Sequence, residues 1–135
     1  MSEKKPDCFV RITGHKDAED IEGFGRHHIK DGRHYIFFEK ETEGIQEKFS
    51  LKIDEEGLEY SRNGVLKSTV VLRTGQQTVS QYVTPYGQFE MGFFTTSFKI
   101  SKEDGHLTVN AGYDMTLNGQ KHESGRINIE VEDRR

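Results

Sequence analysis

The sequence has little cysteine and proline, no tryptophan and no long apolar run. Its 135 residues include one cysteine, two prolines and no tryptophan. Because the single cysteine, Cys8, cannot form an internal disulfide, we expect a reducing, cytoplasmic compartment. The N-terminal residues Met-Ser-Glu-Lys-Lys-Pro lack the apolar segment of a signal peptide. No apolar run approaches the roughly 20 residues of a spanning helix, so we expect no membrane partner.

A strong excess of charge of one sign is also missing. The chain has 19 basic and 23 acidic residues, for a formal net charge of -4. This balance supplies no long-range field that would attract nucleic acid, so no nucleic-acid partner is expected. The length predicts a single domain over residues 1–135. Within it we expect residues 1–6 to be flexible and residues 16–31, which show no sustained helical stripe, to form a loop.

Alternation of apolar and polar residues is the strongest pattern present. Apolar residues recur at every second position from Leu107 to Leu117, which predicts a strand with one buried and one solvated face. Asn118-Gly119 follows, a dipeptide that favours the two positive φ angles of a type I′ hairpin turn. A second alternating run, Ile127 to Val131, completes a terminal hairpin. The same pattern places Cys8 in a core strand and Arg11 on the solvated side of it.

Short turns separate the alternating segments along the rest of the chain. Parallel pairing needs crossovers of a dozen residues or more, which these turns do not provide. The sequence therefore predicts an all-β meander of about nine or ten antiparallel strands. Closure of the first strand on the last would remove both exposed edges, so we expect a closed barrel rather than a sandwich.

One segment changes phase. Phe89, Met91 and Phe93 share one face, whereas Phe94, Phe98 and Ile100 have the opposite parity. A β-bulge or corner near Gly92 would bring both groups to the interior.

A resemblance to a known family rests on Tyr82-x-Thr84-Pro85-Tyr86-Gly87, on Met91, on Thr95-Thr96, and on Gly105-x-Leu107 leading to Tyr113-x-Met115-x-Leu117. These motifs are similar to those of the bacterial YwiB-like proteins, and the similarity runs from about Tyr35 onward. The resemblance implies a calycin-like, or lipocalin-like, barrel. It implies no particular activity.

Calycin-like barrels that enclose a cavity usually hold an apolar or amphipathic ligand, so a small-molecule binding barrel is the leading functional hypothesis. Tyrosines offer rigid faces with polar tips, and methionine adapts to irregular shapes. We therefore expect the ligand site to contain Tyr60, Tyr82, Tyr86, Met91 and Tyr113. Pro85 and Gly87 are also explained by a tight turn alone.

The alternative is a non-enzymatic protein-interaction or structural module, with a homodimer as one form of it. Large side chains would then fill the barrel core: Phe37, Phe49, Tyr60, Phe89, Met91, Phe93 and Tyr113. The sequence does not decide between an open and a filled interior.

Catalytic and metal motifs give no positive signal. His27 and His28 are adjacent, near His34, but neighbours on a strand point to opposite faces and cannot chelate together. We expect these histidines to be solvated loop residues, and we predict no metal site, no cofactor and no catalytic residue. An inward arginine among Arg11, Arg73 and Arg126 would hold a ligand carboxylate.

Overall fold

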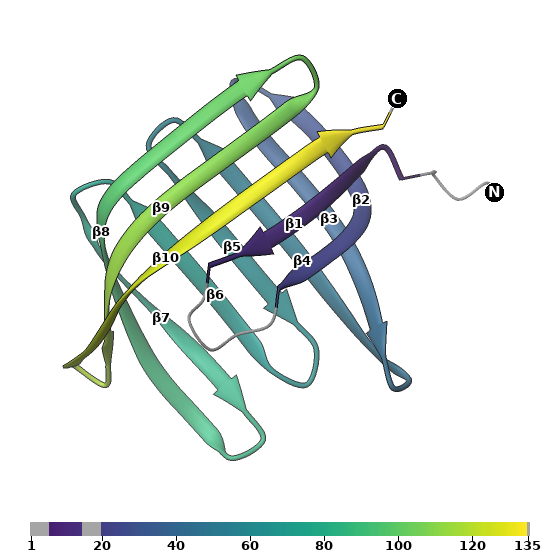
Figure 1. The fold of residues 1–135 in the computed structure, drawn as a ribbon. Coiled ribbons are helices and arrows are strands. Elements are labelled where there is room, and N and C mark those ends of the chain that lie inside the picture. The colour runs from purple at the N-terminus through teal and green to yellow at the C-terminus, as the bar shows by residue number, and fades with distance from the viewer. Residues whose placement is uncertain (1–5, 15–19, 135) are drawn as a thin grey trace.

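Ten antiparallel strands form one wall that closes into a barrel (Figure 1). The computed structural model describes residues 6–14 and 20–134. Each strand pairs with the next one along the chain, and β1 pairs with β10 to close the barrel. The predicted closed meander is therefore confirmed. The strands are β1 (Cys8–Thr13), β2 (Ile21–Lys30), β3 (Arg33–Thr42), β4 (Ile45–Asp54), β5 (Gly57–Asn63), β6 (Lys67–Arg73), β7 (Gln77–Thr84), β8 (Gly87–Glu103), β9 (His106–Leu117) and β10 (Gln120–Asp133).

The turn between β9 and β10 has the predicted chemistry. Asn118 and Gly119 have φ angles of 49° and 83°, so both central positions are left-handed. A type I′ turn requires this, because its twist matches that of the flanking strands. The turn fixes the register in which Leu117 faces Gln120.

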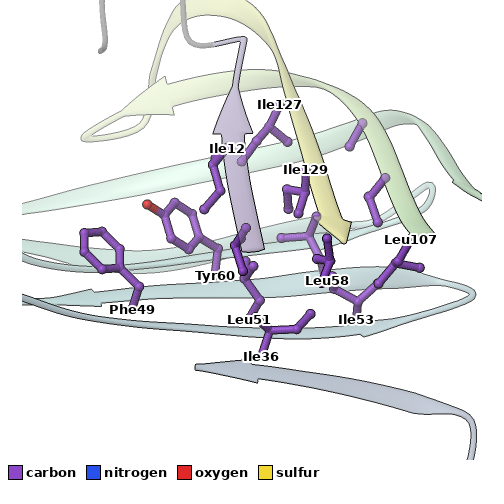
Figure 2. Packing of buried hydrophobic residues seen from close by; sticks show 14 of the residues in the cluster. Ile12, Ile36, Phe49, Leu51, Ile53, Leu58, Tyr60, Leu107, Ile127 and Ile129 are labelled. Carbon is purple, nitrogen blue, oxygen red and sulfur yellow. The ribbon is translucent and has the colours of Figure 1, made fainter. Parts of the chain in front are cut away.

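The interior is a layer of aliphatic side chains supplied by every second residue of the strands (Figure 2). Cys8, Val10 and Ile12 from β1 are at most 1% exposed, so the predicted burial of Cys8 is confirmed. Arg11 points outward, as predicted, and pairs with Glu22 at 3.0 Å. The other fully buried aliphatic side chains come from six further strands: Ile36, Leu51, Ile53, Leu58, Leu72, Val109, Ile127, Ile129 and Val131. Each such burial stabilises the fold by about 1.5–3 kcal/mol.

The change of phase in β8 is a bulge, but it lies later than predicted. The register between β8 and β9 shifts between Thr95 and Ser97, not at Gly92. Phe94 precedes the bulge and is 39% exposed, so the prediction that it shares the face of Phe98 and Ile100 is wrong. Phe98 and Ile100 follow the bulge and point to the interior. The extra residue reverses the face on which every later residue of the strand lies.

Two further predictions are corrected. Residues 21–30 of the predicted loop form β2, while residues 16–19 lie outside the described part of the chain, as do residues 1–5. The loop prediction failed because Gly23 and Gly25 weaken a strand signal, yet here Phe38 packs its ring over Gly23. Phe37 is 45% exposed on the outer wall, so it does not fill the core.

Among the residues that the structure describes, no helix has the length and apolarity needed to span a bilayer.

Candidate functional site at the seam between β6 and β7

The wall of the barrel is weakly joined between β6 and β7, and we call this junction the seam. Only two residue pairs connect the strands there, Lys67 with Val83 and Ser68 with Tyr82. By contrast, seven pairs join β5 to β6 and eight join β7 to β8. Beyond Ser68 the ladder stops. Figure 1 shows the β7–β8 hairpin extending beyond the neighbouring turns at this side of the barrel.

Side chains and a bridge to β8 replace the missing ladder. The hydroxyl of Thr78 donates to the carbonyl oxygen of Val71 across the seam. Further along, Thr74 forms an isolated parallel bridge with Thr95, and the Gly75 amide donates to the Thr95 carbonyl at 3.2 Å. A junction held in this way opens at a lower free-energy cost than a full ladder.

The inward face of β7 carries two polar residues. Its inward positions are Thr78, Ser80 and Tyr82, which face Phe93, Met91 and Phe89 of β8 in the register. Its outward positions include Val79, which is 57% exposed. Hydrophobicity alone would turn the valines inward, so β7 places polar groups in the interior at the expense of apolar burial. Departures of this kind from local rules concentrate at functional sites.

Three buried hydroxyl groups lie on the strands around the seam. They belong to Tyr60 of β5, Ser80 of β7 and Thr95 of β8, and none has a hydrogen-bond partner within the described residues. Tyr60 is 7% exposed and Thr95 is 1% exposed. Because a buried polar group without a partner costs about 1–3 kcal/mol, each of these groups needs an explanation.

Tyr60 ends a row of stacked aromatic rings. The Phe38 and Phe49 rings are 4.6 Å apart and nearly parallel, and Phe49 is 6.5 Å from Tyr60. Figure 2 shows the Tyr60 hydroxyl pointing away from the aliphatic side chains. Burial raises the pKa of Tyr60 to about 12, so the phenol keeps its proton and can donate a hydrogen bond.

An ion pair flanks these rings. Arg62 donates to Glu47 through two hydrogen bonds, of 2.7 and 3.1 Å, and its guanidinium lies 5.4 Å from the centre of the Phe49 ring. The hydrogen bonds from Arg62 lower the pKa of the Glu47 carboxyl, and the same bonds raise the pKa of Arg62. Both groups are therefore charged at neutral pH, and each neutralises the other.

A hollow of about 210 Å³ opens on the outside of the seam. Its lining includes Thr69 and Gln81 on the two sides of the seam, together with Arg62 and Ser68. Arg62 and Ser68 face each other in the register. The hollow therefore leads from solvent to the ion pair.

The structure brings some of the predicted site residues to the seam and separates one. Tyr60, Tyr82 and Met91 lie on β5, β7 and β8, and Tyr113 of β9 faces Thr95 in the register. Tyr86 is 95% exposed in the turn between β7 and β8, away from the interior.

The residues that sequence reasoning missed are Glu47, Arg62, Ser80 and Thr95. Ser80 gave no signal, because serine occurs on either face of a strand, and Thr95 enters only through the family motif. Glu47 and Arg62 have the parity of the core residues Phe49 and Tyr60, and this could have indicated an inward ion pair.

A second buried polar cluster lies at the other end of the barrel. His27 is 5% exposed and His34 is 2% exposed, so the prediction that they are solvated is wrong. His28 is exposed. The His27 ring is hydrogen-bonded through Nε2 to His34 and through Nδ1 to the Asp133 carboxylate. The described residues contain no group of three or more His, Cys, Asp or Glu side chains arranged to hold a metal ion.

A shallow groove of about 730 Å³ crosses the outer wall over β2 to β5. It follows a cross-strand row in which Arg26 faces Phe37, Phe37 faces Ser50, and Ser50 faces Ser61. The small side chains of Ser50 and Ser61 leave the space for this groove, because larger side chains stand around them. The groove is larger than the hollow at the seam, but none of the buried hydroxyls without partners lies in it.

The fold and the seam define a closed, ten-stranded, up-and-down β-barrel with a polar inner patch. Residues 10–129 match the model of a family described as a domain of unknown function (DUF1934), and the chain belongs to this family. It is 20% identical over 123 residues to the uncharacterized beta-barrel protein YwiB of Bacillus subtilis, covering 91% of this chain and 87% of that protein. The crystal structure of ywiB protein from Bacillus subtilis superposes with a TM-score of 0.73, over 93% of this chain and 89% of that one. The resemblance to bacterial YwiB-like proteins is thereby confirmed.

Proposed function

We propose that the protein binds a small amphipathic molecule inside the barrel, beside the seam, and that the molecule enters between β6 and β7. The observation that carries this proposal is the set of three buried hydroxyls without protein partners, on Tyr60, Ser80 and Thr95. A bound polar group would satisfy those of the hydroxyls that it reaches, and their desolvation cost would then be recovered on binding.

The surroundings suit the apolar part of such a molecule. Val70 and Met91 lie on opposite sides of the seam and are only partly buried against the core. Methionine fills irregular spaces and rearranges easily, so Met91 can make room for an alkyl chain. The weak junction between β6 and β7 provides the route, because only two residue pairs of the ladder need to shift.

This function is the one that calycin-like barrels commonly serve, and that analogy is part of the argument. We place the protein in the reducing cytoplasm, because its single cysteine is buried and cannot form an internal disulfide.

Calorimetric titration with 1-octanol tests the proposal. We expect saturable binding, and we expect Tyr60→Phe to weaken it by about two- to tenfold, the effect of one net hydrogen bond. Tyr86→Phe is the matched control and should leave the affinity unchanged, because Tyr86 is exposed. Absence of saturable binding, or equal affinity in Tyr60→Phe and wild type, would show that the hydroxyls hold only water.

A second candidate is a protein-binding surface over the outer groove. The observation in its favour is the exposure of two phenylalanines there, Phe24 at 56% and Phe37 at 45%. A homodimer through this face is the simplest form, and light scattering on Phe37→Ser and wild type would test it. A monomeric wild-type protein would contradict the homodimer.

A further inference from the structure

We infer that the molecule bound at the seam carries an uncharged polar head group, such as an alcohol, ester or amide, and not a free carboxylate or amine. The inference rests on the proposed function, since it concerns the same three hydroxyls. It adds the chemical class of the ligand.

The charges that act on the Tyr60 hydroxyl neutralise each other. Glu47 and Arg62 are the charged groups whose electric fields act on Tyr60, and they are bound to each other through two hydrogen bonds. Lys40, which also acts on Glu47, is exposed. Buried His34 and partly buried Asp133 interact with each other and with exposed Lys102 at the opposite end of the barrel.

A charged head group would therefore have to break the ion pair. A carboxylate that took Arg62 would leave Glu47 negative and partly buried, and an ammonium that took Glu47 would leave Arg62 in the same position. The side chains of Arg62 and Glu47 are only 33% and 15% exposed, so water cannot fully compensate for the lost partner. Removing one partner from a partly buried pair leaves the other charge uncompensated, which is unfavourable.

The hydroxyls themselves suit a neutral head group. Each hydroxyl of Tyr60, Ser80 and Thr95 can donate one hydrogen bond and accept others. Because the pKa of Tyr60 is raised to about 12, it offers an O–H and never a phenolate at neutral pH. A carbonyl oxygen or an alcohol can bond to such groups without bringing a charge into the interior.

The test uses four molecules that share an eight-carbon chain and carry different head groups: 1-octanol, methyl octanoate, sodium octanoate and octylamine hydrochloride. Their dissociation constants are measured at pH 7.5 by calorimetry on the wild-type protein. We expect the two neutral molecules to bind at least tenfold more tightly than the two charged ones. Tighter or equal binding of octanoate or octylamine overturns the inference and leaves the proposed function standing. If none of the four binds, the proposed function itself fails.

A variant then tests whether the ion pair is the reason. Glu47→Gln leaves Arg62 without its carboxylate partner. We therefore expect the dissociation constant of octanoate, divided by that of 1-octanol, to fall at least tenfold. Glu22→Gln is the matched control, since it removes an ion pair with Arg11 on the outer wall, and the preference should stay at the wild-type value. An unchanged preference in Glu47→Gln overturns the role given to the pair. The wild-type comparison decides the ligand class even if Glu47→Gln fails to fold.

Discussion

Nε2 of His27 lies 2.8 Å from Nδ1 of His34, so the two buried imidazoles share one proton in a direct hydrogen bond. The other nitrogen of His27 lies 3.2 Å from the Asp133 carboxylate, which favours a proton on that side. His34 is then the donor to His27 in the neutral pair. Because the residues come from β2, β3 and β10, the chain of bonds connects strands on both sides of β1.

We predict that acid weakens the fold through this pair. Burial lowers the pKa of His34, and the positive charges of His27 and Lys102 lower it further, while Asp133 opposes them. The unfolded chain then binds a proton more readily than the folded one, with an ordinary histidine pKa of about 6.5. Stability is therefore complete above about pH 6.5 and falls below it, by at most about 1.4 kcal/mol for each pH unit.

Urea unfolding at pH 7.5 and pH 5.5 measures this loss, above the range in which carboxylates titrate. We expect wild type to lose stability between the two values and His34→Asn to lose less. His28→Asn, the exposed neighbour of His27, should behave like wild type. Equal wild-type stability at both pH values contradicts the prediction.

The aliphatic layer should account for much of the stability. Ile129 is 0% exposed in β10, so Ile129→Ala leaves a cavity and should cost about 2–5 kcal/mol. Ile29 is 61% exposed at the end of β2, and Ile29→Ala should change stability by no more than about 0.5 kcal/mol. Both values come from urea unfolding at pH 7.5. Similar losses of unfolding free energy in the two variants would contradict the burial of Ile129 and the exposure of Ile29.

The seam should control the entry of ligand. If the ladder continued beyond Ser68 and Tyr82, Thr69 would face Gln81, and both line the hollow there. A disulfide in Thr69→Cys/Gln81→Cys should slow association of 1-octanol at least tenfold, and reduction should restore it. NMR exchange measurements give the rate.

The matched control is Lys52→Cys/Glu59→Cys, which joins β4 to β5 outside the hollow, where the ladder is complete. Its disulfide should leave the association rate unchanged. If the seam disulfide forms and the rate does not change, the ligand does not enter there.

The fold was predictable because its signals are local. Alternation along β9 and the Asn118-Gly119 turn each specify a hairpin without reference to the rest of the chain. The bulge in β8 was predictable in kind but not in place. Parity shows only that a shift occurs between Phe93 and Phe98, and the pairing with β9 decides that it falls after Thr95.

The candidate site was less predictable because it depends on contacts between distant strands. Tyr60 and Met91 were expected from residue type, but Ser80 faces inward only because the register of β7 with β8 puts it opposite Met91. His27 was predicted to be a solvated loop residue because two glycines precede it. Its burial depends on His34 of β3 and Asp133 of β10, two strands that are far apart in the sequence. No local pattern reports such partners.

The most direct test of the central claim is an intermolecular NOE measurement on the complex with 1-octanol, using protein labelled at the methionine methyl groups and the phenylalanine rings. Met91 of β8 and Met115 of β9 both pack against the core. β8 pairs with β7 at the seam, and β9 pairs with β8. We predict NOEs from the alkyl chain of the ligand to the Met91 methyl group, with none to the rings of Phe24 and Phe37. NOEs to those outer rings and not to Met91 would place the ligand in the outer groove and contradict binding inside the barrel.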